Sequence, residues 1–300
     1  MKAIQFTEYG GPEQVRWAEA PEPHAGAGQV RVAVRAASVN PIDWKILSGM
    51  MARGTPLEGV GYLGRDAAGV VDEVGEGVTG VSVGDEVIGS GANAQAEYAV
   101  LGAWAAKPAS VDWAVGAAVG VAGETGERAL RLLGVESGQT LFVDGGAGGV
   151  GAIAVQMGVA RGARVIASAS EGNHDYLRQL GATPVTYGEG VADRVREAAG
   201  GRVDAVFDVA GKTAVEDLLG LVAEKAQVLT IANYAATESG IRFSGGGDDS
   251  HPAEALALVA EMLERNELVV QFQTFPFARA QEAYRISLGG HVRGKLVLVP

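Results

Sequence analysis

The sequence predicts an α/β protein that combines a β-rich region with a doubly wound parallel sheet. From residue 140 onward, apolar strand-like runs alternate with helical segments, an order typical of a parallel sheet covered by helices on both faces. The first of these runs ends abruptly in glycines, and a long apolar segment follows. The first hundred residues instead contain short apolar runs separated by glycine turns, which indicates a β-rich domain.

Four short strands are expected in the β-rich region, the first at residues 1–6. Residues 29–36 alternate polar and apolar side chains, as a half-buried strand does. Residues 68–75 and 85–89 are predicted to be further strands, because glycine turns bound them. The segment 111–133 is predicted to be largely helical, apart from the glycines at 120–126.

The region that follows is predicted to alternate strands and helices. The strands are expected at residues 140–144, 164–168, 183–187, 203–208 and 227–232. A glycine-rich polar segment at 239–250 is expected to be a mobile loop, and a helix is expected at 253–265. The last strand, 295–299, is expected to return to the first domain, because the parallel sheet is already complete.

The glycine cluster after the strand at 140–144 matches a dinucleotide-binding motif. Three glycines fit G-x-G-x-x-G between a strand and a helix. The first permits a tight turn, the second lets backbone N–H groups approach a pyrophosphate, and the third allows close helix–strand packing. The helix start adds N–H donors and partial positive charge, whereas a purely structural turn is the alternative. The predicted cofactor loop comprises Gly146, Ala147, Gly148, Gly149, Val150 and Gly151.

Composition limits the partners and the chemistry of the chain. Its 300 residues are 47% apolar and 20% charged, as expected for a globular protein of one or two domains. The net charge of −12 disfavours a nucleic-acid or anionic-membrane partner, which needs a basic face. Without cysteine there is no disulfide, thiolate nucleophile or cysteine-based metal site. The N-terminus lacks the apolar stretch of a signal peptide, so we expect a cytoplasmic protein without transmembrane helices.

Six sequence blocks resemble one known family. They are SVNPIDWK at 38–45, GRDAAGVVDEVG at 64–75, GDEV at 84–87, AEY at 96–98, the glycine loop at 145–151 and RGKLV at 293–297. In this order they are similar to the zinc-independent medium-chain dehydrogenases/reductases of the quinone oxidoreductase (zeta-crystallin-like) family. The resemblance implies a homodimer whose active site lies in a cleft between two domains. These are a GroES-like substrate domain (1–115 and 266–300) and a Rossmann dinucleotide-binding domain (116–265).

The residues that hold zinc in related dehydrogenases are missing. Zinc-dependent relatives carry Cys near the position of Asn40, and Gly-His-Glu where this chain has Gly64-Arg65-Asp66. No histidine shows metal-ligand spacing, so we expect no metal site and histidines at the surface or at helix ends. The histidines are His24, His174, His251 and His291.

The end of the second parallel strand bears on the choice between NADPH and NADH. NAD-binding domains usually place an Asp or Glu there to hold the ribose 2′-OH. Small residues here leave room for a 2′-phosphate, but Glu171 and Gly172 replace a cation that relatives often carry. We therefore expect NADPH, and NADH stays open. By resemblance, Ser170 and Tyr187 match positions that contact the adenosine phosphate. The remaining predicted cofactor residues are Thr125, Ser168, Ala210, Ile231 and Asn233.

The predicted reaction is hydride transfer from a nicotinamide to a quinone or an α,β-unsaturated carbonyl compound. Conjugation spreads the negative charge that develops on the acceptor oxygen, whereas an unactivated ketone needs a Lewis acid. We expect Asn40 to lie beside the nicotinamide and to donate to a substrate oxygen. Asp43 is expected to orient the loop. Lys295 either adds positive charge near the cofactor or is a solvated surface lysine, and both interpretations stay open.

The surroundings of Thr125 depart from the family pattern. Glu124 and Glu127 replace apolar or aromatic residues, and Gly120 replaces a proline. Buried carboxylates are costly, so we expect both glutamates to point to solvent. Two alternative functions stay open: a pathway-specific enoyl reductase, and a cofactor-binding protein with little catalytic activity.

Overall fold

The computed structural model describes residues 1–300, and the chain divides into two compact units. Unit 1 comprises Met1–Val121, Pro252–Asn266 and Val270–Pro300, and unit 2 comprises Ala122–His251 and Glu267–Val269. The boundaries predicted for the GroES-like and Rossmann domains stay a prediction.

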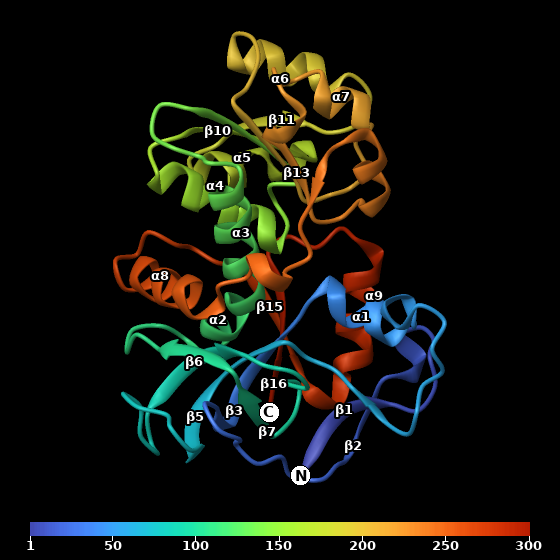
Figure 1. Cartoon of the computed structure of the whole chain (residues 1–300), viewed down its shortest axis with the longest axis vertical. Coiled ribbons are helices and arrows are strands. Elements are labelled where there is room, and N and C mark those ends of the chain that lie inside the picture. Colours follow the sequence, from blue (N-terminus) through green and yellow to red (C-terminus); the bar gives the residue numbers. More distant parts are fainter. The chain divides into compact units, whose positions relative to one another are not determined.

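Unit 1 is built on two β-sheets (Figure 1). The larger sheet has the order β15-β16-β3-β5-β6-β8, and β7 also pairs with β3. Its strands are β3 (Val30–Val39), β5 (Asp66–Val74), β6 (Glu86–Ser90), β7 (Tyr98–Leu101), β8 (Ala103–Ala106), β15 (Phe272–Pro276) and β16 (Lys295–Val299). All pairings are antiparallel except that of β15 with β16. A small antiparallel sheet has the order β2-β1-β4, with β1 (Lys2–Phe6), β2 (Arg16–Glu19) and β4 (Gly61–Tyr62).

Alternation along β3 decides which of its side chains enter the core of unit 1. Val30, Val32 and Val34 are buried, while the residues between them are partly exposed, as the sequence predicts. The last four residues of the strand are all buried. The strand therefore leads into the interior, where Asn40 joins it to α1 (Pro41–Leu47).

The other helices of unit 1 are α2 (Trp113–Ala118), α8 (Pro252–Glu264) and α9 (Ala280–Gly289). Both units also contain short 3₁₀ helices. They are η1 (Pro12–Gln14), η2 (Met50–Ala52), η3 (Glu171–Asn173), η4 (Lys225–Gln227), η5 (Tyr234–Ser239), η6 (Gly247–Asp249) and η7 (Phe277–Arg279).

Unit 2 contains one parallel sheet of six strands in the order β11-β10-β9-β12-β13-β14, with helices packed around it (Figure 1). The strand order reverses between β9 and β12, as in a doubly wound sheet. The predicted α/β fold is confirmed. The strands are β9 (Thr140–Asp144), β10 (Arg164–Ala169), β11 (Thr183–Thr186), β12 (Ala205–Asp208), β13 (Val228–Thr230) and β14 (Arg242–Phe243). The helices are α4 (Gly149–Ala160), α5 (His174–Gln179), α6 (Val191–Ala199) and α7 (Val215–Leu219), together with α3 (Gly120–Leu132), which begins in unit 1.

Two segments differ from the sequence-based expectation. The helix α3 runs through the glycines at 120–126, so the predicted interruption is wrong. A Cβ at Gly126 would lie 3.4 Å from the Met157 sulfur, which indicates close packing of α3 on α4. The predicted loop at 239–250 contains β14 and η6, and Arg242 pairs with Asp249 at 3.1 Å.

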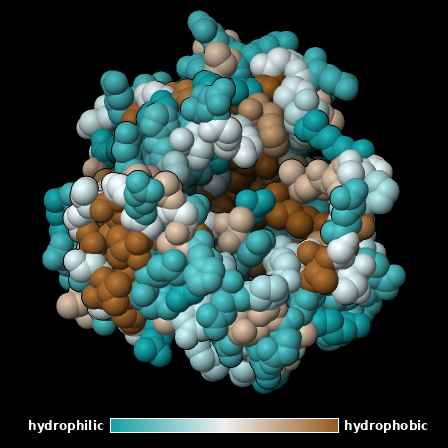
Figure 2. Space-filling view, turned by 60° about the horizontal axis from the view of Figure 1, so that its bottom comes forward, coloured by the Kyte–Doolittle hydropathy of each residue, from teal (hydrophilic) through white to brown (hydrophobic).

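Figure 2 shows a face on which hydrophilic residues predominate and apolar residues form a few separate groups. No helix has the length and the apolar character that crossing a membrane requires.

Candidate active site

The glycine loop of unit 2 has the geometry of a dinucleotide cradle. It follows β9 through Gly145, whose φ of +92° favours glycine. A Cβ at Gly146 would lie 2.7 Å from the Ala167 side chain, and one at Gly151 would lie 2.2 Å from the Gly145 carbonyl oxygen. Glycine is therefore required at both positions by packing. At Gly148 the nearest atom would be 3.7 Å away, so here the absent side chain leaves the backbone open.

The helix α4 begins directly after this loop. Its N-cap is Gly148, which offers no side chain to cap the first N–H groups. Because the first turn of a helix has N–H groups without intrahelical acceptors, the start of α4 presents donors and partial positive charge. Gly149, Val150 and Gly151 form this first turn, and Ala147 precedes it. The predicted loop thus matches an anion-binding arrangement.

Two buried carboxylates, Asp144 and Asp208, hold the backbone at the carboxyl ends of β9 and β12. The Gly145 N–H donates to the Ser168 hydroxyl (2.9 Å), and Ser168 in turn donates to Asp144 at the end of β9. The Ser168 hydroxyl, predicted to contact the cofactor, is therefore engaged within the protein. On β12, Asp208 accepts from Gly211 N–H (2.7 Å) and from the Thr230 hydroxyl (2.7 Å). Burial, and secondarily the neighbouring charge of Asp144, raises the pKa of Asp208.

The predicted adenosine end lies beyond β10. Ser170 is half-buried, and its hydroxyl accepts from Asn173 Nδ2 at 3.1 Å. Gly172 has no heavy atom within 4 Å of the position of a Cβ, so a larger side chain fits there. Tyr187, just after β11, is 52% exposed. This corner is open enough for a phosphate group.

The remaining predicted cofactor residues of the sheet follow β12 and β13. Ala210 lies two residues after β12, and a Cβ at Gly145 would lie 3.2 Å from its methyl group. Ile231 and Asn233 follow β13, and the Ile231 N–H donates to the Asp208 carbonyl oxygen at 3.1 Å. These residues lie at the carboxyl ends of parallel strands, where ligands of open α/β sheets bind.

A buried arginine on α3 organises the surroundings of Thr125. The Arg128 guanidinium donates to the Glu124 carboxylate (2.8 and 3.3 Å) and to Thr125 Oγ1 (3.4 Å). It also donates to the carbonyl and hydroxyl oxygens of Ser244, and Ser250 donates to Glu124 at 2.7 Å. All five guanidinium N–H groups are thus used within unit 2.

The expectation that both glutamates point to solvent is wrong. The Glu124 side chain is only 12% exposed, because it pairs with Arg128 one helical turn away. Glu127 is 20% exposed and pairs with Arg161. Ion pairing compensates the cost of burying these carboxylates, and sequence reasoning did not anticipate the two arginine partners.

In unit 1, Asn40 and Asp43 form the start of α1. The Asp43 carboxylate accepts from the Asn40 N–H at 2.8 Å, which makes the two residues a reciprocal capping box. Asp43 also accepts from Gln95 Nε2 at 3.2 Å, while its Oδ1 is buried without a hydrogen-bond partner. Burial, with a smaller contribution from the charge of Asp66, raises the pKa of Asp43 to about 7. Asp43 thus caps the first turn of α1, and its role in catalysis stays a prediction.

Lys295 reaches the same place from β16. It is 5% exposed, and its ammonium group donates to the side-chain oxygen of Asn40. The interpretation of Lys295 as a solvated surface lysine is therefore wrong. Burial lowers the pKa of its ammonium group, and the negative charges of Asp66 and Asp43 oppose that shift. The three predicted catalytic residues are thus brought together in unit 1.

Sequence reasoning missed the residue that connects this cluster, Asp66 at the start of β5. It is fully buried, and its Oδ1 accepts from Ser38 Oγ (2.5 Å) and Asn40 Nδ2 (3.0 Å). Its Oδ2 accepts from the Val121 N–H at 2.9 Å. The sequence did place Asp66 within the segment 64–75, which resembles the family, and this could have marked it as a site candidate. Gln95, which also donates to the Ser38 carbonyl oxygen (2.9 Å), had no signal.

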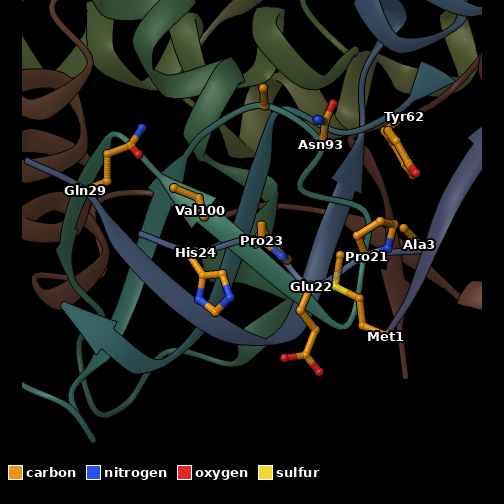
Figure 3. A pocket seen from close by; sticks show the side chains of 12 residues that line it. Met1, Ala3, Pro21, Glu22, Pro23, His24, Gln29, Tyr62, Asn93 and Val100 are labelled. Atoms are coloured by element: carbon orange, nitrogen blue, oxygen red, sulfur yellow. The ribbon is translucent and has the colours of Figure 1, made fainter. Parts of the chain in front are cut away.

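A separate hollow of about 450 Å³ lies elsewhere in unit 1 (Figure 3). Met1, Pro21 and Pro23 line it together with the polar side chains of His24 and Asn93. None of the predicted catalytic residues lines this hollow. It is therefore distinct from the Asn40 cluster.

Comparison with known proteins identifies the family. A model of the alcohol dehydrogenase GroES-like domain matches residues 26–133, and a model described as zinc-binding dehydrogenase matches residues 149–245. The chain is 30% identical to the quinone oxidoreductase of Pseudomonas aeruginosa, with 100% of this chain and 99% of that protein covered. The chain belongs to the quinone oxidoreductase family. The predicted family and the pairing of GroES-like and Rossmann folds are confirmed.

Other quinone oxidoreductase family members extend this similarity. The chain is 29% identical to the chloroplastic NADPH-dependent alkenal/one oxidoreductase of Arabidopsis thaliana, with 100% of this chain and 80% of that protein covered. A mycobacterial structure complexed with NADPH is 28% identical and has a TM-score of 0.87, with both chains fully covered.

Although one matching family model is described as zinc-binding, the residues of this chain do not fit a zinc site. The sequence contains no cysteine, and no three His, Asp or Glu side chains are grouped to hold a metal. The Asn40 amide group instead binds Asp66 and Lys295.

Proposed function

We propose that this quinone oxidoreductase family member is an NADPH-dependent reductase of quinones or α,β-unsaturated carbonyl compounds. The observation that carries the proposal is a buried Lys295 ammonium group, hydrogen-bonded to the side-chain oxygen of Asn40. The names of the Pseudomonas and Arabidopsis relatives support both acceptor classes.

The glycine loop fits a dinucleotide. Side chains are excluded by packing at Gly146 and Gly151, and the backbone is open at Gly148. The start of α4 and the open corner beside Ser170 and Gly172 would hold the pyrophosphate and the adenosine phosphate. A dinucleotide held there would supply the hydride, from its nicotinamide C4, that reduces the electron-poor carbon of the acceptor.

The chain contributes charge and orientation to this reaction. When the acceptor carbon gains a C–H bond, negative charge develops on the conjugated oxygen. A buried ammonium group stabilises such charge more strongly than an exposed one, because the surroundings have a low dielectric constant. Lys295 supplies this group, Asn40 and Asp43 hold it in place, and solvent supplies the final proton.

The first experiment is a fluorescence titration with NADPH and NADH, followed by nicotinamide oxidation at ~340 nm with 1,4-benzoquinone and with an enone. Tighter binding of NADPH with turnover of either acceptor is the expected result. Binding without turnover of simple acceptors favours the pathway-specific enoyl reductase or the cofactor-binding protein with little activity. Absence of binding would refute the proposal.

Three further features belong to the proposal, of which the homodimer rests on the family resemblance. A homodimer is proposed, and sedimentation of the purified protein at micromolar concentration tests it. The substrate is proposed to be a small molecule, and the location to be cytoplasmic. Fractionation of cells that express the tagged chain tests the location.

A further inference from the structure

The amide group of Asn40 is held at both ends by buried neighbours. Its Nδ2 donates to Asp66 Oδ1 (3.0 Å) and to Ser38 Oγ (3.1 Å), and these two oxygens lie 2.5 Å apart, so they share one amide hydrogen. Its oxygen accepts from Lys295. Asn40 is 3% exposed, so replacing these partners with a ligand would first require breaking buried hydrogen bonds.

The Asp66 carboxylate decides this orientation of the amide. A carboxylate accepts hydrogen bonds only, so the NH₂ end of Asn40 must face Asp66 and the carbonyl end must face away from it. Asp66 itself cannot turn freely. Its Oδ1 also accepts from Ser38 Oγ (2.5 Å), and its Oδ2 accepts from the Val121 N–H (2.9 Å) in the first turn of α3.

The carbonyl end of Asn40 then holds Lys295. An ammonium group has three donor hydrogens, and Asn40 accepts one of them. The charged groups that face Lys295 are Asp66 and Asp43. Around Asp43, Arg65 and Tyr284 are the further titratable groups, and the Tyr284 hydroxyl donates to Gln95 at 2.7 Å. Asp66 thus acts on Lys295 both through the Asn40 amide and through its charge.

We infer that Asp66 is a positioning residue that fixes the Asn40 amide so that its oxygen holds Lys295, and that Lys295 donates to the acceptor oxygen. The inference rests on the proposed reductase function and refines it. It moves the role of substrate donor from Asn40, where the sequence suggested it, to Lys295. In this arrangement Asn40 is also a positioning residue.

The test compares Asp66→Asn with Asp72→Asn, a change on the same strand. The Asp72 carboxylate pairs with Arg31 at 2.9 Å and is partly exposed, away from the cluster. The chain has six lysines, so the ¹⁵N-labelled Lys295 ammonium signal can be assigned with Lys295→Met and followed by NMR through a pH titration. Asp66→Asn should lower the titration midpoint of Lys295 by about one pH unit or more, because a nearby negative charge is lost. Asp72→Asn should leave it in place.

Turnover provides the second readout. Asp66→Asn should lower kcat at least about tenfold, with the KM for NADPH changed less than about threefold. Unchanged Lys295 titration or unchanged kcat in Asp66→Asn would overturn the inference. The NMR titration needs no turnover, so failure of the proposed function would appear separately, as absence of activity in the unmodified protein.

Asn40→Ala keeps the test decisive if Asp66→Asn does not fold. If Lys295 is the donor, Lys295→Met should lose at least about tenfold more kcat than Asn40→Ala. Asn40→Ala should also lower the titration midpoint of Lys295, because the ammonium group loses its acceptor. Equal or larger loss of kcat in Asn40→Ala than in Lys295→Met would return the donor role to Asn40 and refute the inference.

Discussion

Two alanine substitutions in the glycine loop separate packing from cofactor binding. A Cβ at Gly151 would lie 2.2 Å from the Gly145 oxygen and 2.9 Å from the Gly145 carbonyl carbon and Gly146 Cα. These are backbone atoms, so the loop itself must move. A Cβ at Gly148 would meet only the Gly145 oxygen, at 3.7 Å, which is an ordinary contact.

The two variants should therefore differ in stability. Overpacking of this kind costs ~1–3 kcal/mol, so Gly151→Ala should lower Tm by about 2–10 °C. Gly148→Ala should leave Tm within about 2 °C of the unmodified protein. Its methyl group instead occupies the open side of the loop. Loss of one hydrogen bond between backbone and pyrophosphate costs ~1.5–3 kcal/mol, so NADPH affinity should fall about 10- to 100-fold.

Thermal unfolding of the cofactor-free protein and fluorescence titration with NADPH measure both effects. Gly102→Ala is the matched control, because no heavy atom lies within 4 Å of its Cβ position. If Gly148→Ala binds NADPH as tightly as the unmodified protein, the loop is not the pyrophosphate site. If Gly151→Ala unfolds at the unmodified Tm, the packing argument is wrong.

Three further predictions address other parts of the structure. Gly172→Arg should raise the ratio of NADPH to NADH affinity about tenfold, since the site has room for the side chain, and an unchanged ratio would place the adenosine phosphate elsewhere. Arg128→Met should destabilise the fold by ~3–5 kcal/mol in a denaturant titration, because Glu124 loses its buried partner. As the control, Arg265→Met removes an exposed pair with Glu261 and should cost less than ~1 kcal/mol in the same assay. The pKa of Asp43 is about 7 in the folded state, whereas in the unfolded chain it is ~4. Protonation of Asp43 therefore contributes fully to the free energy of unfolding below pH ~4. This contribution is lost as the pH rises to about 7. Asp43→Asn should flatten that decline in Tm, and an unaltered slope would contradict the assignment.

Local patterns were sufficient for the parallel sheet and the cofactor loop. Strands and helices of unit 2 are set by short-range periodicity, and the glycine spacing follows from contacts within a few residues. Errors arose where tertiary packing overrides local preference. The glycines of α3 were expected to interrupt it, but packing on α4 stabilises the helix through Gly126.

The fold class, the family resemblance and the choice of Asn40, Asp43 and Lys295 as site candidates all followed from sequence patterns. What each of these side chains does could not be inferred from those patterns. Lys295 lies 255 residues from Asn40, and Asp66 lies 26 residues from it, so no local pattern records their contact. Hydrogen-bond donors and acceptors are assigned only when partners meet in space, and burial then sets their charge. The tertiary structure alone decided that Asn40 is held by its neighbours and that Lys295 is buried.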